Sequence, residues 1–368
     1  MKELFKTRFF SLEGDRIIWL ITLFLCSISL IAVYSAGGAF LKQLFYISAA
    51  LGVMFVCSKL DYRISSKFSF PLLVIGLIVL VLTITIGDKH NDARRSLFEI
   101  QTFYFIGLCV IIFFAQYLTV AQHSHKINSR PYLMTAFLGI SLICILMIKE
   151  NMSTGLILFV TVFILFFISE IKGKYLAGFV GCGVLGLLLL LTVGFGRGDT
   201  GSGRLSHYTG KAYSINYARQ IEPAKAVIAT TGLIPAGPGK GIFKNYIAEK
   251  DTDYIYAVVF EELGSVLAIL ILILYIVFFT RVWLIATRVD GIFALFLTAG
   301  IGFWICTQAI IHIGVSCELL PATGQTLPFI SRGGTSVIIS GAAVGILLSI
   351  SKTISKKEKP SKNYGQVA

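Results

Sequence analysis

Long, continuous apolar runs dominate the pattern of hydrophobic and polar positions along the chain. They lie near 17–36, 41–58, 70–87, 103–120, 132–148, 153–169, 175–195, 256–280, 292–313 and 335–351. About 20 apolar residues cross a bilayer as a helix, whereas barrel strands alternate apolar and polar positions. The pattern therefore predicts an all-α, polytopic membrane protein of about ten transmembrane helices.

The polar stretches between these runs divide the chain into parts. We expect a short N-terminal segment over 1–16, the membrane domain over 17–353 and a polar, lysine-rich tail over 354–368. The connection 196–255, between the seventh and eighth runs, is much longer than the others. Within it, the apolar residues of 215–231 recur at helical spacing that suits a membrane-surface helix. We expect a large structured loop here, because long connections usually carry function.

Composition and charge agree with a membrane protein and set its orientation. The chain is 56% hydrophobic and 14% charged, with a net charge of +13. Eighteen basic residues fall on segments sharing a side with the N-terminus, against six on the short opposite segments. Because cytoplasmic loops are rich in Lys and Arg, both termini are predicted to be cytoplasmic and the long loop extracytoplasmic. We therefore expect contact with anionic lipid and no nucleic-acid partner.

Four carboxylates gather where the long loop meets the eighth run: Asp251, Asp253, Glu261 and Glu262. An unpaired charge at the hydrocarbon boundary costs on the order of a few kcal/mol. Glu261 or Glu262 is therefore expected to pair with a basic residue of the loop. Asp253, at the rim, is the candidate base or metal ligand of an interfacial reaction. The alternative is that Asp251 and Asp253 only cap a helix N-terminus.

Basic residues offer a way to hold an anionic substrate at the membrane surface. The candidates are Arg204, Arg219, Lys225, Lys240, Lys244 and Arg332. The alternative for each is solvation and contact with lipid headgroups. Arg332 is the only charge in 319–336, an apolar segment with two prolines and three glycines. Such a non-helical segment is expected to line a cavity, with Arg332 meeting a phosphate or a carboxylate such as Glu261, and with Ser331, Gly333 and Gly334 in structural roles.

Three motifs in this order, 233–241, 251–264 and 320–336, resemble the SEDS family, the FtsW and RodA proteins of bacterial cell-wall synthesis. The resemblance implies a ten-span inner-membrane glycosyltransferase that polymerises lipid II into glycan strands on the outer face. In that family the Asp of the D-[FY]-I-[FY]-A motif is the catalytic carboxylate, and Asp253 occupies the matching position. The diphosphate leaving group is expected to need cations or a divalent ion such as Mg²⁺ or Mn²⁺, for which no ligands are assigned.

The form of the last motif, Thr-Gly-Gln-Thr-Leu-Pro, is more similar to FtsW than to RodA. This likeness implies septal synthesis in division, beside a class B penicillin-binding transpeptidase and other divisome proteins. A RodA-like elongation polymerase, a lipid II flippase or transporter, and a non-catalytic scaffold remain the alternatives.

Two positions depart from the family pattern. Where relatives usually show Q-P-S-E-[LF]-x-K at the fourth span, with a Glu and a Lys facing an inner cavity, this chain has Tyr104 and Gly107. Where they show D-x-G-[TS] at the sixth span, it has 151–154, with Glu150 beside it as a substitute carboxylate. A cavity salt bridge is therefore not carried over.

Overall fold

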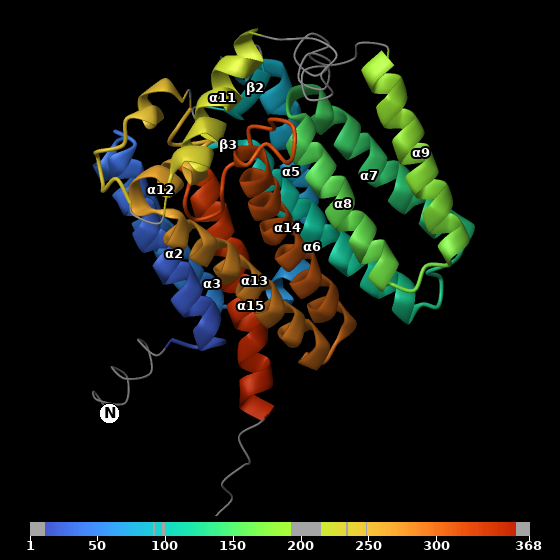
Figure 1. The fold of residues 1–368 in the computed structure, drawn as a ribbon. Coiled ribbons are helices and arrows are strands. Elements are labelled where there is room, and N and C mark those ends of the chain that lie inside the picture. The colour runs from blue at the N-terminus through green and yellow to red at the C-terminus, as the bar shows by residue number, and fades with distance from the viewer. Residues whose placement is uncertain are drawn as a thin grey trace, which may run out of the picture.

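The computed structural model describes residues 12–90, 93–97, 100–192, 215–232, 235–247 and 249–357, and these are mostly helical (Figure 1). The long helices are α2 (Arg16–Ser35), α3 (Phe40–Lys59), α5 (Ser69–Ile86), α6 (Thr102–His123), α7 (Arg130–Glu150), α8 (Met152–Ile168), α9 (Gly173–Thr192), α13 (Ser265–Arg288), α14 (Ile292–Ser316) and α15 (Thr335–Lys357). The shorter ones are α4 (Arg63–Lys67), α11 (Ile215–Thr230), η1 (Phe243–Tyr246) and α12 (Ile255–Leu263). The predicted all-α membrane protein is confirmed.

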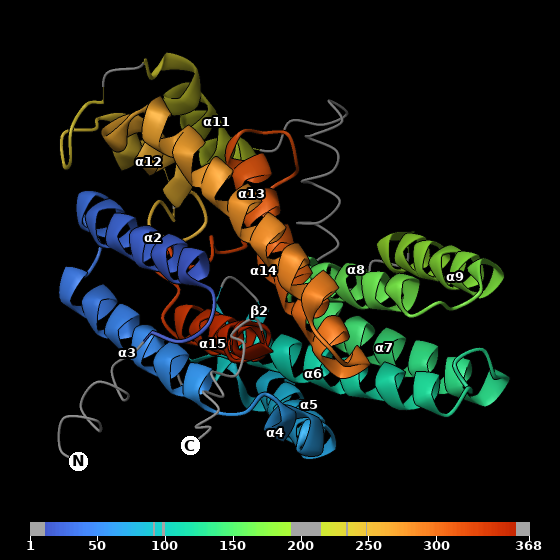
Figure 2. The ribbon, with the colours of Figure 1, turned by 90° about the horizontal axis from the view of Figure 1, so that it is seen from below.

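Eight of these helices are long and apolar enough to cross a membrane, and α8 is a shorter apolar helix. Burial separates central from peripheral helices. In the most apolar 18-residue stretch of each helix, 72% of the residues are buried in α6 and in α14, but only 22% in α3 and 28% in α5. The peripheral helices expose large apolar side chains such as Leu41 and Phe45. A helix that is apolar on all sides is stable only where lipid or protein surrounds it. Figure 2 shows α9 at one edge, beside α7 and α8.

The predicted eighth span is present, but its predicted bounds of 256–280 are wrong. The chain breaks at Gly264, whose φ of 88° ends α12, and the spanning helix α13 begins at Ser265. The Tyr256 hydroxyl donates to the Ala268 carbonyl at 3.0 Å, although a continuous helix would separate these residues by about 18 Å. The short helix α12 therefore folds back against α13, and its last turn does not continue into the spanning helix.

A small antiparallel sheet joins α5 to α6 and adds to the predicted all-α fold. It contains β1 (Asp88–His90), β2 (Ala93–Leu97) and β3 (Ile100–Gln101), in the order β1-β2-β3. The sequence here shows little of the apolar alternation that marks a half-buried strand. The backbone N–H of Gln101 donates to the Thr335 hydroxyl at 2.9 Å, which holds the sheet against the start of α15.

The two ends of the bundle differ in structure (Figure 1). One end, here named the loop face, carries α11, α12 and the irregular segments 249–254 and 319–334. The other, the terminal face, carries the start of α2 and the end of α15.

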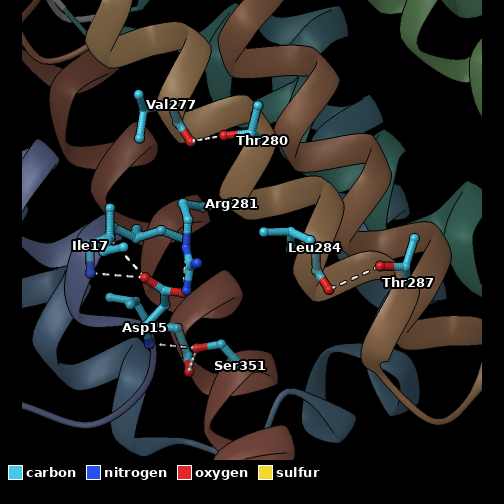
Figure 3. A network of polar contacts seen from close by, with 10 residues as sticks. Asp15, Ile17, Val277, Thr280, Arg281, Leu284, Thr287 and Ser351 are labelled. Atoms are coloured by element: carbon cyan, nitrogen blue, oxygen red, sulfur yellow. Dashed lines mark hydrogen bonds and ion pairs between the residues drawn. The ribbon is translucent and has the colours of Figure 1, made fainter.

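Polar contacts join three helices at the terminal face. Asp15 caps α2 by accepting from the N–H groups of Ile17 and Ile18 at 2.9 and 3.1 Å. Figure 3 shows that the same carboxylate meets Arg281 of α13, and that the Asp15 N–H donates to Ser351 of α15. The ends of α2, α13 and α15 are therefore fixed to one another at this face.

Candidate active site

Asp253 lies in a tight turn on the loop face, directly before α12. The backbone N–H groups of Thr252, Asp253 and Tyr254 all donate to the Glu249 carbonyl, at 3.2, 3.0 and 3.3 Å. The Tyr254 ring is buried in a small apolar cluster with α11. The Asp253 side chain itself is half-buried. The 249–254 turn therefore places a carboxylate at the edge of the protein with its backbone held on one side.

Neither Asp251 nor Asp253, the residues considered as helix caps, occupies the N-cap position of α12. The N-cap position of α12 is Tyr254, whose side chain makes no capping hydrogen bond. Asp251 instead forms an ion pair with Arg332, with Oδ2 and Nη1 2.8 Å apart. Arg332 thus meets a carboxylate, as expected, and this carboxylate is Asp251 where Glu261 was the example considered.

Segment 319–334 also contacts the 249–254 turn through backbone groups. The Arg332 N–H donates to the Asp251 carbonyl at 2.8 Å, and the Ser331 hydroxyl donates to the Thr252 carbonyl at 2.7 Å. The same hydroxyl accepts from the Leu327 N–H at 2.8 Å. Ser331 thereby joins its own segment to the turn that precedes Asp253.

Buried polar side chains of α2, α3 and α13 hold segment 319–334 from inside the bundle. The Ser29 hydroxyl of α2 donates to the Ile330 carbonyl at 2.7 Å and accepts from the Gln43 amide of α3 at 2.8 Å. The Tyr275 hydroxyl of α13 donates to the Pro328 carbonyl. Non-helical backbone at membrane depth is tolerated where protein satisfies its polar groups. The described contacts show this segment packed against protein at these positions.

The glycines of the last motif lie where side chains do not fit or the backbone disfavours them. A Cβ on Gly333 would lie 1.9 Å from the Ser336 hydroxyl oxygen, and Gly334 has a φ of 51°. Both residues connect the Arg332 position to the start of α15. The structural role expected for them therefore agrees with their geometry.

Glu261 and Glu262 are buried at the end of α12, where segment 235–247 surrounds them. Glu262 accepts from the N–H groups of Gly239 and Gly241, each at 3.1 Å, and forms an ion pair with the Lys244 ammonium. Glu261 accepts from the Lys244 N–H at 2.9 Å. Buried carboxylates need this compensation, because desolvation of an ion costs several kcal/mol. The expected pairing with a loop cation is therefore present as the Lys244–Glu262 pair.

The structure separates the six predicted substrate-binding cations. Lys244 is buried, and its ammonium also donates to the Ser35 carbonyl at the end of α2 at 2.6 Å. Lys240 is exposed on the loop face. Lys225 of α11 forms an ion pair with Glu318 at 2.5 Å, and that hydrogen bond raises the pKa of Lys225. Arg204 and the side chain of Arg219 lie outside the described residues.

Helix α11 confirms the helix expected over 215–231, but its buried side chains face protein. Ala224 and Val227 pack with Ile247, Tyr254 and Ala322 in one apolar cluster. A membrane-surface helix would turn these residues toward lipid instead. The helix therefore covers the side of the 249–254 turn.

A neutral polar cluster inside the bundle was not predicted. The Tyr104 hydroxyl shares a hydrogen bond of 2.8 Å with Thr326, and the Gln325 amide donates to Thr154 at 2.8 Å. The His312 ring nitrogen Nδ1 lies 2.6 Å from the Gln325 carbonyl, which requires Nδ1 to be the donor. The absence of the family's Glu and Lys was the available signal.

The position of the missing Lys is filled by packing. A Cβ on Gly107 would lie 2.6 Å from the Trp304 ring, so α14 places an aromatic side chain where a longer residue at 107 would project. The described contacts at these two positions therefore include a hydrogen bond of Tyr104 and the packing of the Trp304 ring against Gly107.

The described part of the chain contains no group of three or more His, Cys, Asp or Glu side chains close enough together to hold a metal ion. Asp251 and Glu262 are engaged by Arg332 and Lys244. The described donor set does not fit a dedicated divalent site. The divalent ion stays a prediction.

Comparison with known proteins gives concordant relatives. The profile of the FtsW, RodA and SpoVE family, described as cell cycle proteins, matches residues 15–356. Stage V sporulation protein E of Bacillus subtilis (strain 168) is 30% identical over 357 residues, covering 92% of this chain and 97% of that protein. The probable peptidoglycan glycosyltransferase FtsW of Coxiella burnetii is 27% identical, covering 84% of this chain and 86% of that protein.

Solved structures show the same fold. A chain from a study of the structural coordination of polymerization and crosslinking by a peptidoglycan synthase complex superposes with a TM-score of 0.75 and 20% identity, covering 94% of this chain and 99% of that one. The rod shape determining protein RodA of Thermus thermophilus gives a TM-score of 0.67 at 20% identity, covering 92% of this chain and 96% of that one.

Proposed function

Because this chain belongs to the FtsW, RodA and SpoVE family of cell cycle proteins, we propose that it is a peptidoglycan glycosyltransferase. Its substrate is lipid II, which it polymerises into glycan strands at the outer face of the inner membrane. The relatives named as probable peptidoglycan glycosyltransferases support the activity. The loop face then lies on the extracytoplasmic side of the membrane, and both termini lie in the cytoplasm. Labelling of single cysteines introduced at Lys240 and Lys352 with an impermeant reagent tests this orientation.

The position of Asp253 is the observation that carries the proposal. Asp251 pairs with Arg332, and Glu261 and Glu262 are bound by segment 235–247. Asp253 lies half-buried at the rim, in a turn whose backbone is fixed by hydrogen bonds. A general base must sit within hydrogen-bond reach of the proton it removes and be held there. The rim of the loop face is where the sugar of a lipid-linked substrate meets the protein.

The reaction follows from this placement. The Asp253 carboxylate accepts the proton of the acceptor sugar's 4-hydroxyl while that oxygen forms a bond to the donor's anomeric carbon. The bond from that carbon to the diphosphate oxygen breaks, and undecaprenyl diphosphate leaves with the electron pair. Basic groups of the loop face lower the cost of the charge that develops on the leaving group.

The loop cations divide into two groups in this proposal. Lys240 is exposed and, with Arg204, Arg219 and Lys225, stays a candidate for binding the diphosphate or the lipid headgroups around it. Lys244 is withdrawn from this group, because its ammonium is buried between Glu262 and Ser35. A cation neutralised in this way offers little attraction to a second anion.

Replacement of the catalytic carboxylate tests the proposal directly. We expect Asp253→Asn to lower the rate of glycan polymerisation from lipid II by about 100- to 10,000-fold, the usual contribution of a general base. The purified full chain is assayed, with its transpeptidase partner, by the length of the strands formed. Asp61→Asn, an exposed carboxylate on the terminal face, is the matched control and should polymerise normally. Normal strand growth by folded Asp253→Asn would refute the proposal.

A lipid II transporter is the second candidate, and the neutral polar cluster favours it. Among the described residues, His312 Nε2, Gln325 Oε1 and Thr323 Oγ1 are buried polar atoms without a hydrogen-bond partner. Such atoms suit the lining of a polar path. Reconstituted vesicles separate the candidates: movement of labelled lipid II without strand growth supports transport, whereas strand growth that needs Asp253 supports polymerisation.

The cellular role is proposed to be septal synthesis beside a class B penicillin-binding transpeptidase. The FtsW-like last motif supports division, and the structural relative from a peptidoglycan synthase complex supports a crosslinking partner. A fluorescent fusion should accumulate at the septum, and depletion of the protein should give filaments. Depletion that gives round cells would instead assign the protein to RodA-like elongation.

A further inference from the structure

We propose that Arg332, Asp251 and Ser331 form a clamp that positions Asp253, and that the Arg332 guanidinium does not bind the diphosphate. This inference rests on the proposed function, because it assigns positioning residues to that reaction. The name "clamp" refers to these three residues only.

Three polar contacts of the clamp reach the two residues that precede Asp253. The Arg332 side chain and backbone N–H contact the side chain and carbonyl of Asp251, both at 2.8 Å. The Ser331 hydroxyl contacts the Thr252 carbonyl at 2.7 Å. On the other side, three N–H groups of the turn converge on the Glu249 carbonyl. The backbone that leads into Asp253 is therefore held from two sides, by two segments without regular structure.

The clamp is itself connected to the helices of the bundle. Ser29 of α2 donates to the Ile330 carbonyl, and the Gln43 amide lies 3.5 Å from the Ser331 carbonyl. A Cβ on Gly38, which joins α2 to α3, would lie 3.2 Å from the Asp251 carboxylate. The ends of α2 and α3 therefore support both partners of the ion pair. Reactive groups must be held to within about 0.5 Å of the productive position, which loops achieve only through such support.

The charge of Arg332 decides between positioning and substrate binding. Its side chain is 40% exposed, but the Asp251 carboxylate that it meets is only 14% exposed. The pair carries no net charge, so it attracts a diphosphate much less than a lone guanidinium would. The same pair gives segment 319–334 a directed contact to the 249–254 turn. The geometry therefore favours a role in holding the turn.

A charge-swap experiment separates the two roles. Steady-state polymerisation is measured with full-length Arg332→Gln, Asp251→Asn and the double variant Asp251→Arg/Arg332→Asp. Since a displacement of about 1 Å costs on the order of 100-fold in rate, we expect each single variant to lose at least about 10-fold in kcat. KM for lipid II should stay within about twofold of the wild-type value. The variants remove no contact to the bound substrate, and KM rises when such ground-state binding is lost. The swapped variant should recover part of the kcat.

Two further variants keep the test decisive if a single variant unfolds. Ser331→Ala removes the hydroxyl contacts to the Thr252 carbonyl and the Leu327 N–H but keeps the Arg332–Asp251 ion pair, and should lower kcat by a smaller factor than Arg332→Gln. Lys59→Gln breaks the Lys59–Glu13 pair of the terminal face, whose atoms lie 3.3 Å apart with both side chains about one-quarter exposed, and should leave kcat unchanged. The unfolding midpoint of every variant is measured in the same detergent.

The results that would overturn the inference differ from those that would overturn the function. A kcat of Arg332→Gln within twofold of the wild-type value would refute the clamp. A large rise in KM that the charge-swapped variant does not reverse would also refute it. In both cases the proposed function stands as long as the wild type polymerises and the Asp253→Asn variant fails to do so. Only strand growth by Asp253→Asn in the same assay removes the function.

Discussion

The two faces of the bundle use the same kind of ion pair to join different structures. At the terminal face, Asp15 and Arg281 join the start of α2 to the last turns of α13, both regular helix ends (Figure 3). At the loop face, Asp251 and Arg332 join two irregular segments. Helical packing already fixes where the ends of α2 and α13 lie. The irregular segments depend instead on the polar contacts between them, so we expect terminal-face pairs to affect stability and loop-face pairs to affect the site.

Glu13 belongs to the terminal-face pattern. Its carboxylate lies 3.3 Å from the Lys59 ammonium at the end of α3 and also pairs with Lys352 of α15. Burial acts to raise the pKa of Glu13, but the two lysines outweigh burial and lower it. A lowered pKa contributes stability above the unfolded-state value, near 4.5, and this contribution is lost only as pH falls further. The pairs of Glu13 with Lys59 and Lys352 are therefore intact at neutral pH.

Breaking the buried Lys244–Glu262 pair should give the largest loss of folding stability. This pair is an exception to the comparison between the faces, because it lies at the loop face and yet should control stability. Lys244→Met leaves the Glu262 carboxylate buried and without its ion-pair partner, which typically costs about 3–5 kcal/mol. Unfolding of the purified protein in mixed micelles measures this loss.

The double variant Lys244→Met/Glu262→Gln is the control for that loss. It removes both charges, so it should recover most of the stability of the single variant. A stable Lys244→Met protein with a raised KM for lipid II would contradict the structural assignment and restore the predicted substrate role of Lys244.

Asp15 provides the second prediction, at the terminal face. Asp15→Ala removes the N-cap of α2, worth about 1 kcal/mol, and the charged contacts to Arg281, worth about 1.5–3 kcal/mol. Asp15→Asn keeps the cap and loses only the charge, so it should be destabilised less. Both losses are measured by unfolding. Polymerisation per folded molecule should equal that of the wild type, and a fall in kcat would contradict the division between the faces.

Local pattern predicted the helices well and their interruption poorly. The first run, expected over 17–36, is found as Arg16–Ser35. Apolar residues continue on both sides of Gly264, so hydropathy alone gives one span where the structure has two helices. At this break, the N–H groups of Ala236 and Gly237 donate to the Glu261 and Glu262 carbonyls at the end of α12. These carbonyls thereby have hydrogen-bond partners although the helix ends. Those contacts come from a distant part of the chain, which no local period reveals.

The candidate site divides in the same way. The short motif around Asp253 was enough to single out this carboxylate as the candidate, because a family motif is a local feature, and its catalytic role stays a prediction. Arg332 was expected to meet a phosphate or a carboxylate, with Glu261 as the example, and the structure pairs it with Asp251. Spacing along the chain gave no reason to prefer one carboxylate over the other. The neutral contacts of Tyr104 and Gln325 were missed for the same reason, since each joins segments far apart in sequence.

The exposed Lys225–Glu318 pair gives the smallest expected effect and sharpens the comparison. It joins α11 to the residues after α14 at the loop face, with Lys225 62% exposed. Exposed pairs contribute little to stability, so Lys225→Gln should leave the unfolding midpoint unchanged within error at pH 7. The apolar contacts of Ala224 and Val227 should hold α11 in place without it.

The pH dependence of that pair has a definite sign. Its hydrogen bond with Glu318 raises the pKa of Lys225 above its usual 10.5, so any stabilisation is complete below that pH and disappears as pH rises through the higher folded-state value. The difference in midpoint between Lys225→Gln and the wild type should therefore stay constant between pH 6 and pH 8. A difference that is large at pH 7 would show that the charge, and not the apolar cluster, holds α11 against the 249–254 turn. Lys225 would then join the loop-face contacts that control the site.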